Sequence, residues 1–180
     1  MECFAELGYD ATRVRHVAER AGVSDAAIYR HYPSMEALGQ ELYNHHFGGF
    51  ARQLQESTSD GTTEQRLRRA VRTTLAAYRA EPAAFTFALL RTSTFLPKLP
   101  AGTAYPIEIL ERIIAAGQRR REVRDGQPNL LAAIFLGCVL RPIILANLAA
   151  PGALNLADPS EHDRVIEDAA VAALRMEAHA

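Results

Sequence analysis

Apolar residues along this chain recur at every third or fourth position, and no run of four or more residues alternates with period two. This spacing gathers apolar side chains on one face of an α-helix, whereas a half-buried strand needs alternation. Glycine and proline residues, among them Gly8, Pro33 and Pro82, divide the chain into about nine such segments. The sequence therefore predicts an all-α fold, with short helices in the first third and longer helices after it.

The stretch Thr12–Tyr32 has the spacing of a helix-turn-helix. Two short helices that cross steeply need a small residue where they meet, and Ala18 supplies it. Gly22 suits a turn with positive φ, and Ser24 can cap the second helix. Ile28 is a branched apolar residue that can fill the gap between the two helices. The remaining core positions of the motif are expected to be Val17, Ala21 and Val23.

The segment FAELGYDATRVRHVAERAGVSDAAIYRHYPSMEAL resembles the amino-terminal domain of the tetracycline-repressor (TetR) family. The similar features are Gly8–Tyr9 after the first helix, a Thr before the second, Ala-Gly-Val-Ser at the turn, and Tyr-x-His-aromatic at the end of the recognition helix. The match spans about residues 3–43. It implies a three-helix DNA-binding head, residues 1–46, on a helical body, residues 47–180, that binds a small ligand and dimerises.

By this resemblance, the helix from Ser24 to about His31 lies in the major groove of double-stranded operator DNA. Its first residues would face base edges or phosphates, and its last residues would contact the backbone. Thr12 would bind a phosphate at the start of the preceding helix, where free backbone N–H groups also favour anions. The expected DNA-binding residues are Thr12, Arg13, Ser24, Asp25, Ala26, Ala27, Tyr29, Arg30 and His31.

The charge of the head differs from that of most DNA-binding surfaces. Residues 1–46 contain four Arg and seven Asp or Glu, whereas positive charge is expected to be in excess. Asp25 stands where the family often has Lys. It could accept a hydrogen bond from a cytosine amino group, or it could simply favour the start of its helix. Met35 replaces another Lys of the family pattern, which removes an expected phosphate contact.

Several Arg residues of the body lie within apolar segments. Small-ligand sites are mostly apolar with a few polar groups, so such an Arg could meet an anionic ligand. Alternatively, each Arg pairs with a nearby acid or extends to solvent. The expected ligand-binding residues are Tyr78, Leu90, Arg91, Phe95, Ile109, Arg112, Phe135 and Cys138. Pro142, inside an apolar segment, is expected to kink its helix or end it.

The last two expected helices, about 129–149 and 160–177, are the best candidates for a homodimer interface. The first of them is apolar nearly all round and needs cover on more than one side. The apolar run Leu130–Leu140 is shorter than the roughly 20 residues that span a membrane, so no membrane partner is expected. Cys3 and Cys138 are expected to be reduced thiols in a cytoplasmic protein.

No metal-ligand spacing, Gly-rich phosphate loop or nucleophile motif occurs, so neither enzymatic activity nor a cofactor is expected. The sequence predicts a ligand-responsive transcriptional regulator, most simply a repressor that binds a palindromic operator as a two-fold dimer. A small apolar or amphipathic effector would release it by favouring a conformation that does not fit the operator. The acidic head leads to an alternative: a ligand-binding helical dimer with weak or lost DNA binding.

Overall fold

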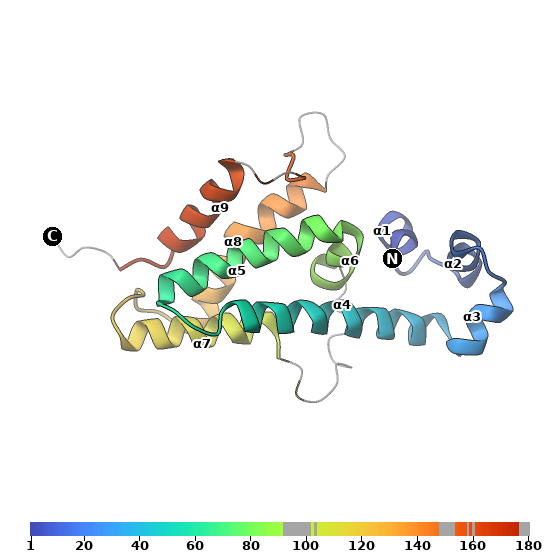
Figure 1. The fold of residues 1–180 in the computed structure, drawn as a ribbon, viewed down its shortest axis with the longest axis horizontal. Coiled ribbons are helices and arrows are strands. Elements are labelled where there is room, and N and C mark those ends of the chain that lie inside the picture. Colours follow the sequence, from blue (N-terminus) through green and yellow to red (C-terminus); the bar gives the residue numbers. More distant parts are fainter. Residues whose placement is uncertain (92–101, 103, 148–153, 158, 160, 177–180) are drawn as a thin grey trace. The chain divides into compact units, whose positions relative to one another are not determined.

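A computed structural model describes residues 1–91, 102, 104–147, 154–157, 159 and 161–176. Within these ranges the chain forms nine α-helices, one π-helical segment and no strand, which confirms the predicted all-α fold (Figure 1). The helices are α1 (Glu2–Leu7), α2 (Val14–Ala21), α3 (Asp25–His31), α4 (Met35–Ser57), α5 (Thr63–Ala80), α6 (Pro82–Phe85), α7 (Pro106–Arg119), α8 (Pro128–Ala146) and α9 (Glu161–Ala172), and the π-helical segment is η1 (Thr86–Arg91).

The chain divides into two compact units. The first contains Met1–Gly49 and Glu81–Thr103, and the second contains Phe50–Ala80 and Ala104–Ala180. The division falls inside α4, directly after Gly49, so this helix contributes to both units. The first unit therefore includes α6 and η1 in addition to the predicted head.

The core of the first unit is aromatic. Phe4 of α1 stacks on Phe87 of η1, with 5.1 Å between the ring centroids. Tyr43 of α4 meets Phe87 edge-on and stacks on Phe47 one turn later. These four side chains are at most 5% exposed. Aromatic pairs of this geometry add specific attraction to the burial of their large surfaces, so they attach α1 firmly to α4 and η1.

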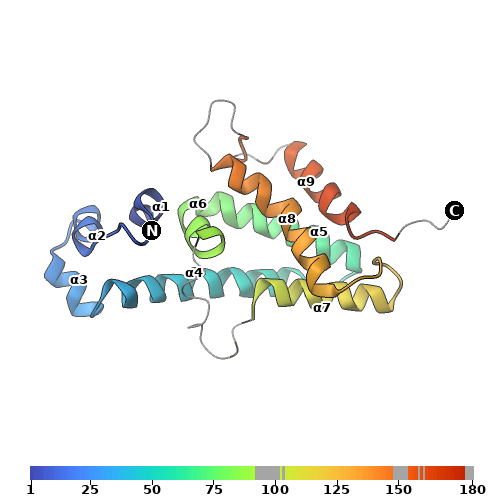
Figure 2. The same ribbon diagram turned by 180° about the vertical axis from the view of Figure 1, so that it is seen from behind.

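The second unit packs α5, α7, α8 and α9 against one another (Figure 2). On α7, buried residues recur at three and four spacing, as expected for a helix with one face in a core. The largest buried side chains of the unit include Leu75, Ile113, Ile114, Phe135 and Ile143. Gly117 lets α7 approach its neighbours closely, because a Cβ there would lie 2.6 Å from Val123 Cγ2.

Helix α8 extends beyond the apolar run seen in the sequence. It continues through Arg141 and Pro142 to Ala146, so of the two effects expected of Pro142, a kink or an end of the helix, the second does not occur. Among the described residues, α8 is also the one helix whose length and composition would allow it to cross a membrane. In the described chain, α8 packs on α5, α7 and α9 and buries one face with Phe135 and Val139.

Candidate nucleic-acid interface

The turn between α2 and α3 has the predicted helix-turn-helix geometry. Gly22 adopts φ 66° and ψ 30°, which is the left-handed conformation that favours glycine. The backbone N–H of Val23 donates to Ala18 O at 2.9 Å and closes the end of α2. Ser24 begins α3, and its Oγ accepts a hydrogen bond from the Ala27 N–H at 3.2 Å. The predicted roles of Gly22 and Ser24 are therefore confirmed.

The interior of the motif differs in part from expectation. Ala18 is 2% exposed, and Val14 is buried beside it. Val23, however, is 45% exposed and Ala21 is also exposed, so placing these two in the core was wrong. The buried Cys3 and Phe4 of α1 supply apolar surface to the head instead. Both cysteines of the chain are free thiols.

Helix α3 presents most of its side chains to solvent and buries none of them completely. Tyr29 is 53% exposed. Ala27 and Ile28 are half-buried and form the inner side of the helix. The outer side consists of the exposed residues Ser24, Asp25, Ala26, Tyr29, Arg30 and His31. A short helix with this division can enter a DNA groove with its outer side while its inner side holds it to the head.

Two exposed arginines lie at the start of α2. Arg13 Nη1 donates to Asp10 O at 2.6 Å, and the backbone N–H of Arg13 donates to Nδ1 of His16 at 3.1 Å. Arg15 Nε lies 3.4 Å from Nε2 of the same imidazole. Within the described part of the chain neither guanidinium pairs with a carboxylate, so both are available to an anionic partner.

Thr12 does not suit the phosphate contact expected from the sequence. The residue is 2% exposed, and its hydroxyl donates to Gly8 O at 2.6 Å and lies 3.2 Å from Cys3 O. A hydroxyl has one hydrogen to donate, and here that hydrogen is used inside the head. The structure thus assigns Thr12 to the junction between α1 and α2.

An ion-pair cluster joins α1 to α2 within the head. Arg20 of α2 pairs with Glu2 at 2.7 Å and with Glu6 at 2.6 Å, both on α1. The hydrogen bond and charge of Arg20 hold the pKa of Glu6 below its usual value. Two of the seven acids of the head and one of its four arginines are therefore held in an internal contact, which leaves the net charge of the head unchanged.

The expected ligand-binding residues are distributed over both units. In the second unit Tyr78, Ile109 and Phe135 are buried and Cys138 is half-buried. Arg112 is exposed, because it lies on the side of α7 away from the buried stripe, so an inward role for its charge is not supported. In the first unit Leu90 is half-buried in η1, and Arg91 ends that segment. Phe95 lies outside the described residues.

Two hollows in the second unit are lined by other residues. A cavity of about 220 Å³ lies between the start of α5, the turn after α7 and the end of α9, with Leu67, Val123 and Leu174 in its wall. An open groove of about 540 Å³ lies between α5 and α9. Neither hollow is lined by the predicted ligand-binding residues.

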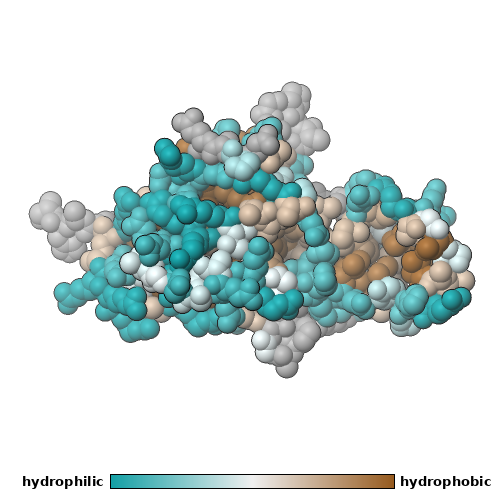
Figure 3. Space-filling view, in the orientation of Figure 1, coloured by the Kyte–Doolittle hydropathy of each residue, from teal (hydrophilic) through white to brown (hydrophobic). Residues whose placement is uncertain are grey.

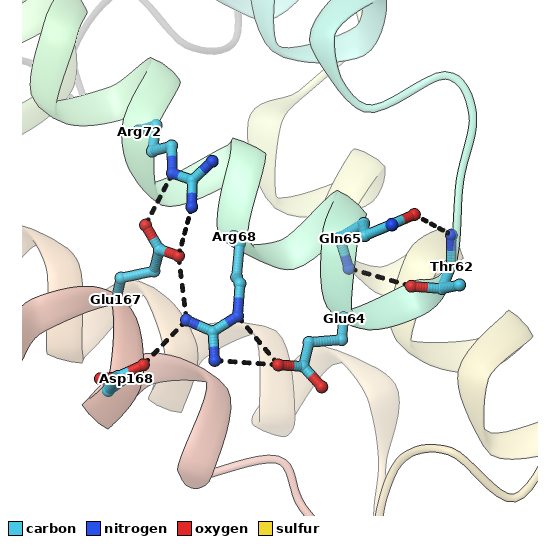
Figure 4. A network of polar contacts seen from close by, with 7 residues as sticks. All are labelled: Thr62, Glu64, Gln65, Arg68, Arg72, Glu167 and Asp168. Carbon is cyan, nitrogen blue, oxygen red and sulfur yellow. Dashed lines mark hydrogen bonds and ion pairs between the residues drawn. The ribbon is translucent and has the colours of Figure 1, made fainter. Parts of the chain in front are cut away.

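The groove between α5 and α9 contains a charged network that sequence reasoning did not identify (Figure 4). Glu167 of α9 is 7% exposed and accepts hydrogen bonds from Arg68 and Arg72 of α5 at 2.8 to 2.9 Å. Arg68 also pairs with Asp168 at 2.8 Å and with Glu64 at 2.9 Å. On the face shown in Figure 3, hydrophilic residues cover this part of α5.

This network holds the pKa of Glu167 below its usual value. Burial alone raises that pKa, but the hydrogen bonds and charges of Arg72 and Arg68 outweigh burial. The only sequence signal was the spacing of Arg68 and Arg72, four residues apart on one face of a helix. That spacing does not indicate which residues, about a hundred positions further along the chain, the two arginines contact.

Both α8 and α9 also expose apolar side chains. On α8 these are Leu130, Ile134 and Leu145, between 40% and 57% exposed. On α9 and just after it they are Val165 and Met176, which are 61% and 49% exposed. Gly137 lies on the same exposed side of α8, and a Cβ there would meet nothing within 4 Å. These two adjacent helices therefore present apolar surface that the described chain does not cover.

Comparisons with known proteins agree with the features of the head and the fold. Residues 1–42 match the family model of bacterial regulatory proteins of the tetR family. The fold is similar to that of the TetR family transcriptional regulator PfmR from Thermus thermophilus, with a TM-score of 0.73 at 19% identity over 99% of this chain and 96% of that one. No curated protein is similar enough in sequence to count as a match.

Two further similar structures carry functional descriptions. The fatty acid degradation regulator FadR from Bacillus halodurans has a TM-score of 0.73 at 18% identity, over 94% of this chain and 89% of that one. AibR, solved in complex with isovaleryl coenzyme A and operator DNA, has a TM-score of 0.70 at 20% identity, over 97% of this chain and 92% of that one. At these identities the likeness establishes the fold.

Proposed function

We propose that this chain, whose first 42 residues match the TetR family and whose fold is that of the family's regulators, is a ligand-responsive transcriptional regulator. The observation that carries the proposal is the outer side of α3. It follows a helix-turn-helix turn, is free of internal packing, and ends in Tyr29, Arg30 and His31. With Arg13 and Arg15 nearby in the motif, it offers the mixture of phosphate and base contacts that groove binding needs.

In this proposal residues 1–46 form the DNA-binding head and residues 47–180 the ligand-binding and dimerisation body. Of the predicted contacts, Ser24, Asp25 and Ala26 belong to the exposed end of α3 that faces base edges and the nearest phosphates, whereas Ala27, also a predicted contact, belongs to its half-buried inner side. Tyr29, Arg30, His31 and Arg13 contact the backbone. Contacts with the DNA backbone add affinity without sequence preference, because every phosphate is alike.

The homodimer forms through the exposed apolar side of α8 and α9. Leu130 and Ile134 lie one helical turn apart, and Ala133 and Gly137 beside them are small and exposed. Small residues let a second helix approach closely, and the flanking apolar side chains then lose contact with water on both copies. A two-fold pair would present its recognition helices roughly 34–36 Å apart, to successive major grooves of a palindromic operator.

The effector is a small apolar or amphipathic molecule bound in the body. The buried Tyr78, Ile109 and Phe135 provide apolar surface on three helices of the second unit. AibR, one of the similar structures, was solved with isovaleryl coenzyme A, which supports acyl thioesters as the first class to test. Such a ligand releases DNA only to the extent that it binds one conformation more tightly than the other.

DNA binding is tested by fluorescence anisotropy with duplexes from the region flanking the protein's own gene, at low and moderate salt. We expect Tyr29→Ala and Arg30→Ala to weaken binding, and Arg30→Ala to reduce the salt slope by about 1. The matched control is Arg52→Ala, an exposed arginine of α4 in the second unit, which removes the same charge outside the head. Equal losses in Arg30→Ala and Arg52→Ala would contradict a specific role for α3.

The dimer is tested by light scattering coupled to gel filtration. Ala133→Glu places a charge in the proposed interface and is expected to yield monomers. Ala76→Glu, at an exposed position of α5, is the matched control and should leave the dimer intact. Thermal shift with coenzyme A, isovaleryl coenzyme A and palmitoyl coenzyme A then separates recognition of the acyl chain from recognition of the nucleotide.

A second candidate function rests on the acid excess of the head. Residues 1–46 carry three more acids than arginines, and Arg20 is occupied by Glu2 and Glu6. A helical dimer that binds its ligand but has weak or lost DNA binding would have this charge pattern. It predicts a thermal shift with a ligand, but no anisotropy change with any duplex at low salt.

A further inference from the structure

The first turn of α3 offers few groups that can donate hydrogen bonds to DNA bases. Its exposed side chains are Ser24, Asp25 and Ala26, and the arginine and histidine of the helix come at its other end. Guanine is usually read by Arg or Lys, and adenine by Asn or Gln. None of these four residue types is present in the first turn. The sequence preference of the helix must therefore depend on a different kind of contact.

Asp25 is not needed to cap its own helix. The Ala27 N–H at the start of α3 already donates to Ser24 Oγ. In the part of the chain that the structure describes, the Asp25 carboxylate has neither a hydrogen-bond nor an ion-pair partner, whereas Glu2 and Glu6 are both held by Arg20. An exposed, unpaired carboxylate at a surface that approaches phosphates is repelled by them, unless a donor on the DNA meets it.

An ionised carboxylate can only accept hydrogen bonds, which restricts the bases it can face in the major groove. Guanine presents two acceptors, N7 and O6, and thymine presents the acceptor O4. Adenine has an amino donor, but the acceptor N7 stands beside it. Cytosine presents its amino group without an adjacent acceptor on the same base. Cytosine is thus the base whose edge complements Asp25 best.

We propose that Asp25 is a specificity-determining residue that selects a cytosine in each half of the operator. Its carboxylate accepts a hydrogen bond from the cytosine N4 amino group and repels the acceptors of guanine and thymine. This inference rests on the proposed DNA binding by α3 and states which base the helix prefers at one position. A mismatch at this position is expected to weaken binding about fivefold or more.

The test is selection from a library of duplex DNA with a randomised core of about two helical turns, with wild type, Asp25→Asn and Asp25→Ala. Wild type should enrich cytosine at one position of each half-site. Asp25→Asn should enrich adenine there, because an amide can bond adenine N6 and N7 together. Asp25→Ala should lose the preference at that position and retain it at the others.

The control is Glu19→Gln, which removes one exposed negative charge from α2. It is expected to tighten binding to all duplexes alike, without a change in the enriched sequence. If Asp25→Asn and Asp25→Ala behave in the same way as Glu19→Gln, the proposal is overturned while DNA binding itself stands. If wild type enriches no sequence at low salt, the proposed function fails, and the role of Asp25 fails with it.

Discussion

Replacing Glu167 with Gln removes the negative charge on which two arginines of α5 converge. The carboxylate accepts from Arg68 Nη1 at 2.9 Å and from Arg72 Nε and Nη2 at 2.8 Å each. Glutamine has almost the same size and keeps one acceptor oxygen, but its amide NH₂ group would face guanidinium donors. At least one charged hydrogen bond is therefore lost without a cavity being created.

The size of the effect follows from burial. A hydrogen bond to a charged group contributes about 1.5–3 kcal/mol. The Arg72 side chain is 65% exposed, so water screens its share, whereas Arg68 is 23% exposed. We therefore expect the free energy of unfolding to fall by about 1.5–2 kcal/mol. For a chain of this length that corresponds to a decrease in Tm of roughly 3–8 °C.

Thermal unfolding followed by circular dichroism, at neutral pH and at about pH 3, checks both the size and the cause. The pKa of Glu167 lies below its usual value of 4.5 in the folded chain, so ionised Glu167 stabilises the fold fully above that value. This contribution disappears as pH falls through the folded pKa. The Tm difference between wild type and Glu167→Gln should therefore shrink at the lower pH.

The matched control is Asp168→Asn. Asp168 is the next residue of α9, but its side chain is 57% exposed and, among the described residues, its carboxylate pairs with Arg68 alone, at 2.8 Å. Its replacement should change Tm far less than that of Glu167. Equal losses in the two variants would show that burial does not set the size of the effect. A Tm difference that persists unchanged at low pH would show that the charge of Glu167 does not cause it.

Three glycines give further predictions, each checked by the midpoint of urea unfolding. Gly117→Ala should lower the free energy of unfolding by about 1–3 kcal/mol, because its Cβ would lie 2.6 Å from Val123 Cγ2 and 2.7 Å from Thr63 Cγ2. An unchanged midpoint would contradict the close packing. Gly49→Ala should stabilise α4 by about 0.5–1 kcal/mol, since its Cβ meets nothing within 4 Å, and a loss of stability would show a hidden contact. Gly22→Ala should lower the free energy of unfolding by about 1–2 kcal/mol, because φ at this position is 66°. Gly22→Asn should lower it less, and equal losses in the two variants would argue against backbone strain.

Features that depend on neighbouring residues were predictable from the sequence. The spacing of apolar positions predicted the all-α fold, and the types of Ala18, Gly22 and Ser24 predicted the turn between α2 and α3. These signals are readable because helix formation, capping and positive φ each depend on residues within about one helical turn. The exposed side of α3, with Tyr29 and Arg30, follows from the same short-range pattern.

Features that depend on long-range packing were not predictable in the same way. Arg112 stands among apolar residues in the sequence, yet α7 turns it to solvent because the buried stripe lies on the opposite side. Thr12 stands at a position that the family resemblance assigns to phosphate binding, but its hydroxyl lies within hydrogen-bond distance of Gly8 O and Cys3 O instead. In both cases the outcome depends on which surface of an element meets its neighbour.

The sequence by itself determined the helices, the helix-turn-helix and the residue types available on α3, because local geometry and hydrophobic periodicity decide these. Only the tertiary structure decided that Glu167 is buried between Arg68 and Arg72, residues more than ninety positions earlier in the chain. It also decided that Leu130 and Ile134 of α8 remain exposed. Both outcomes depend on how α5, α8 and α9 are rotated against one another, and that rotation minimises the free energy of the whole core rather than of any one segment.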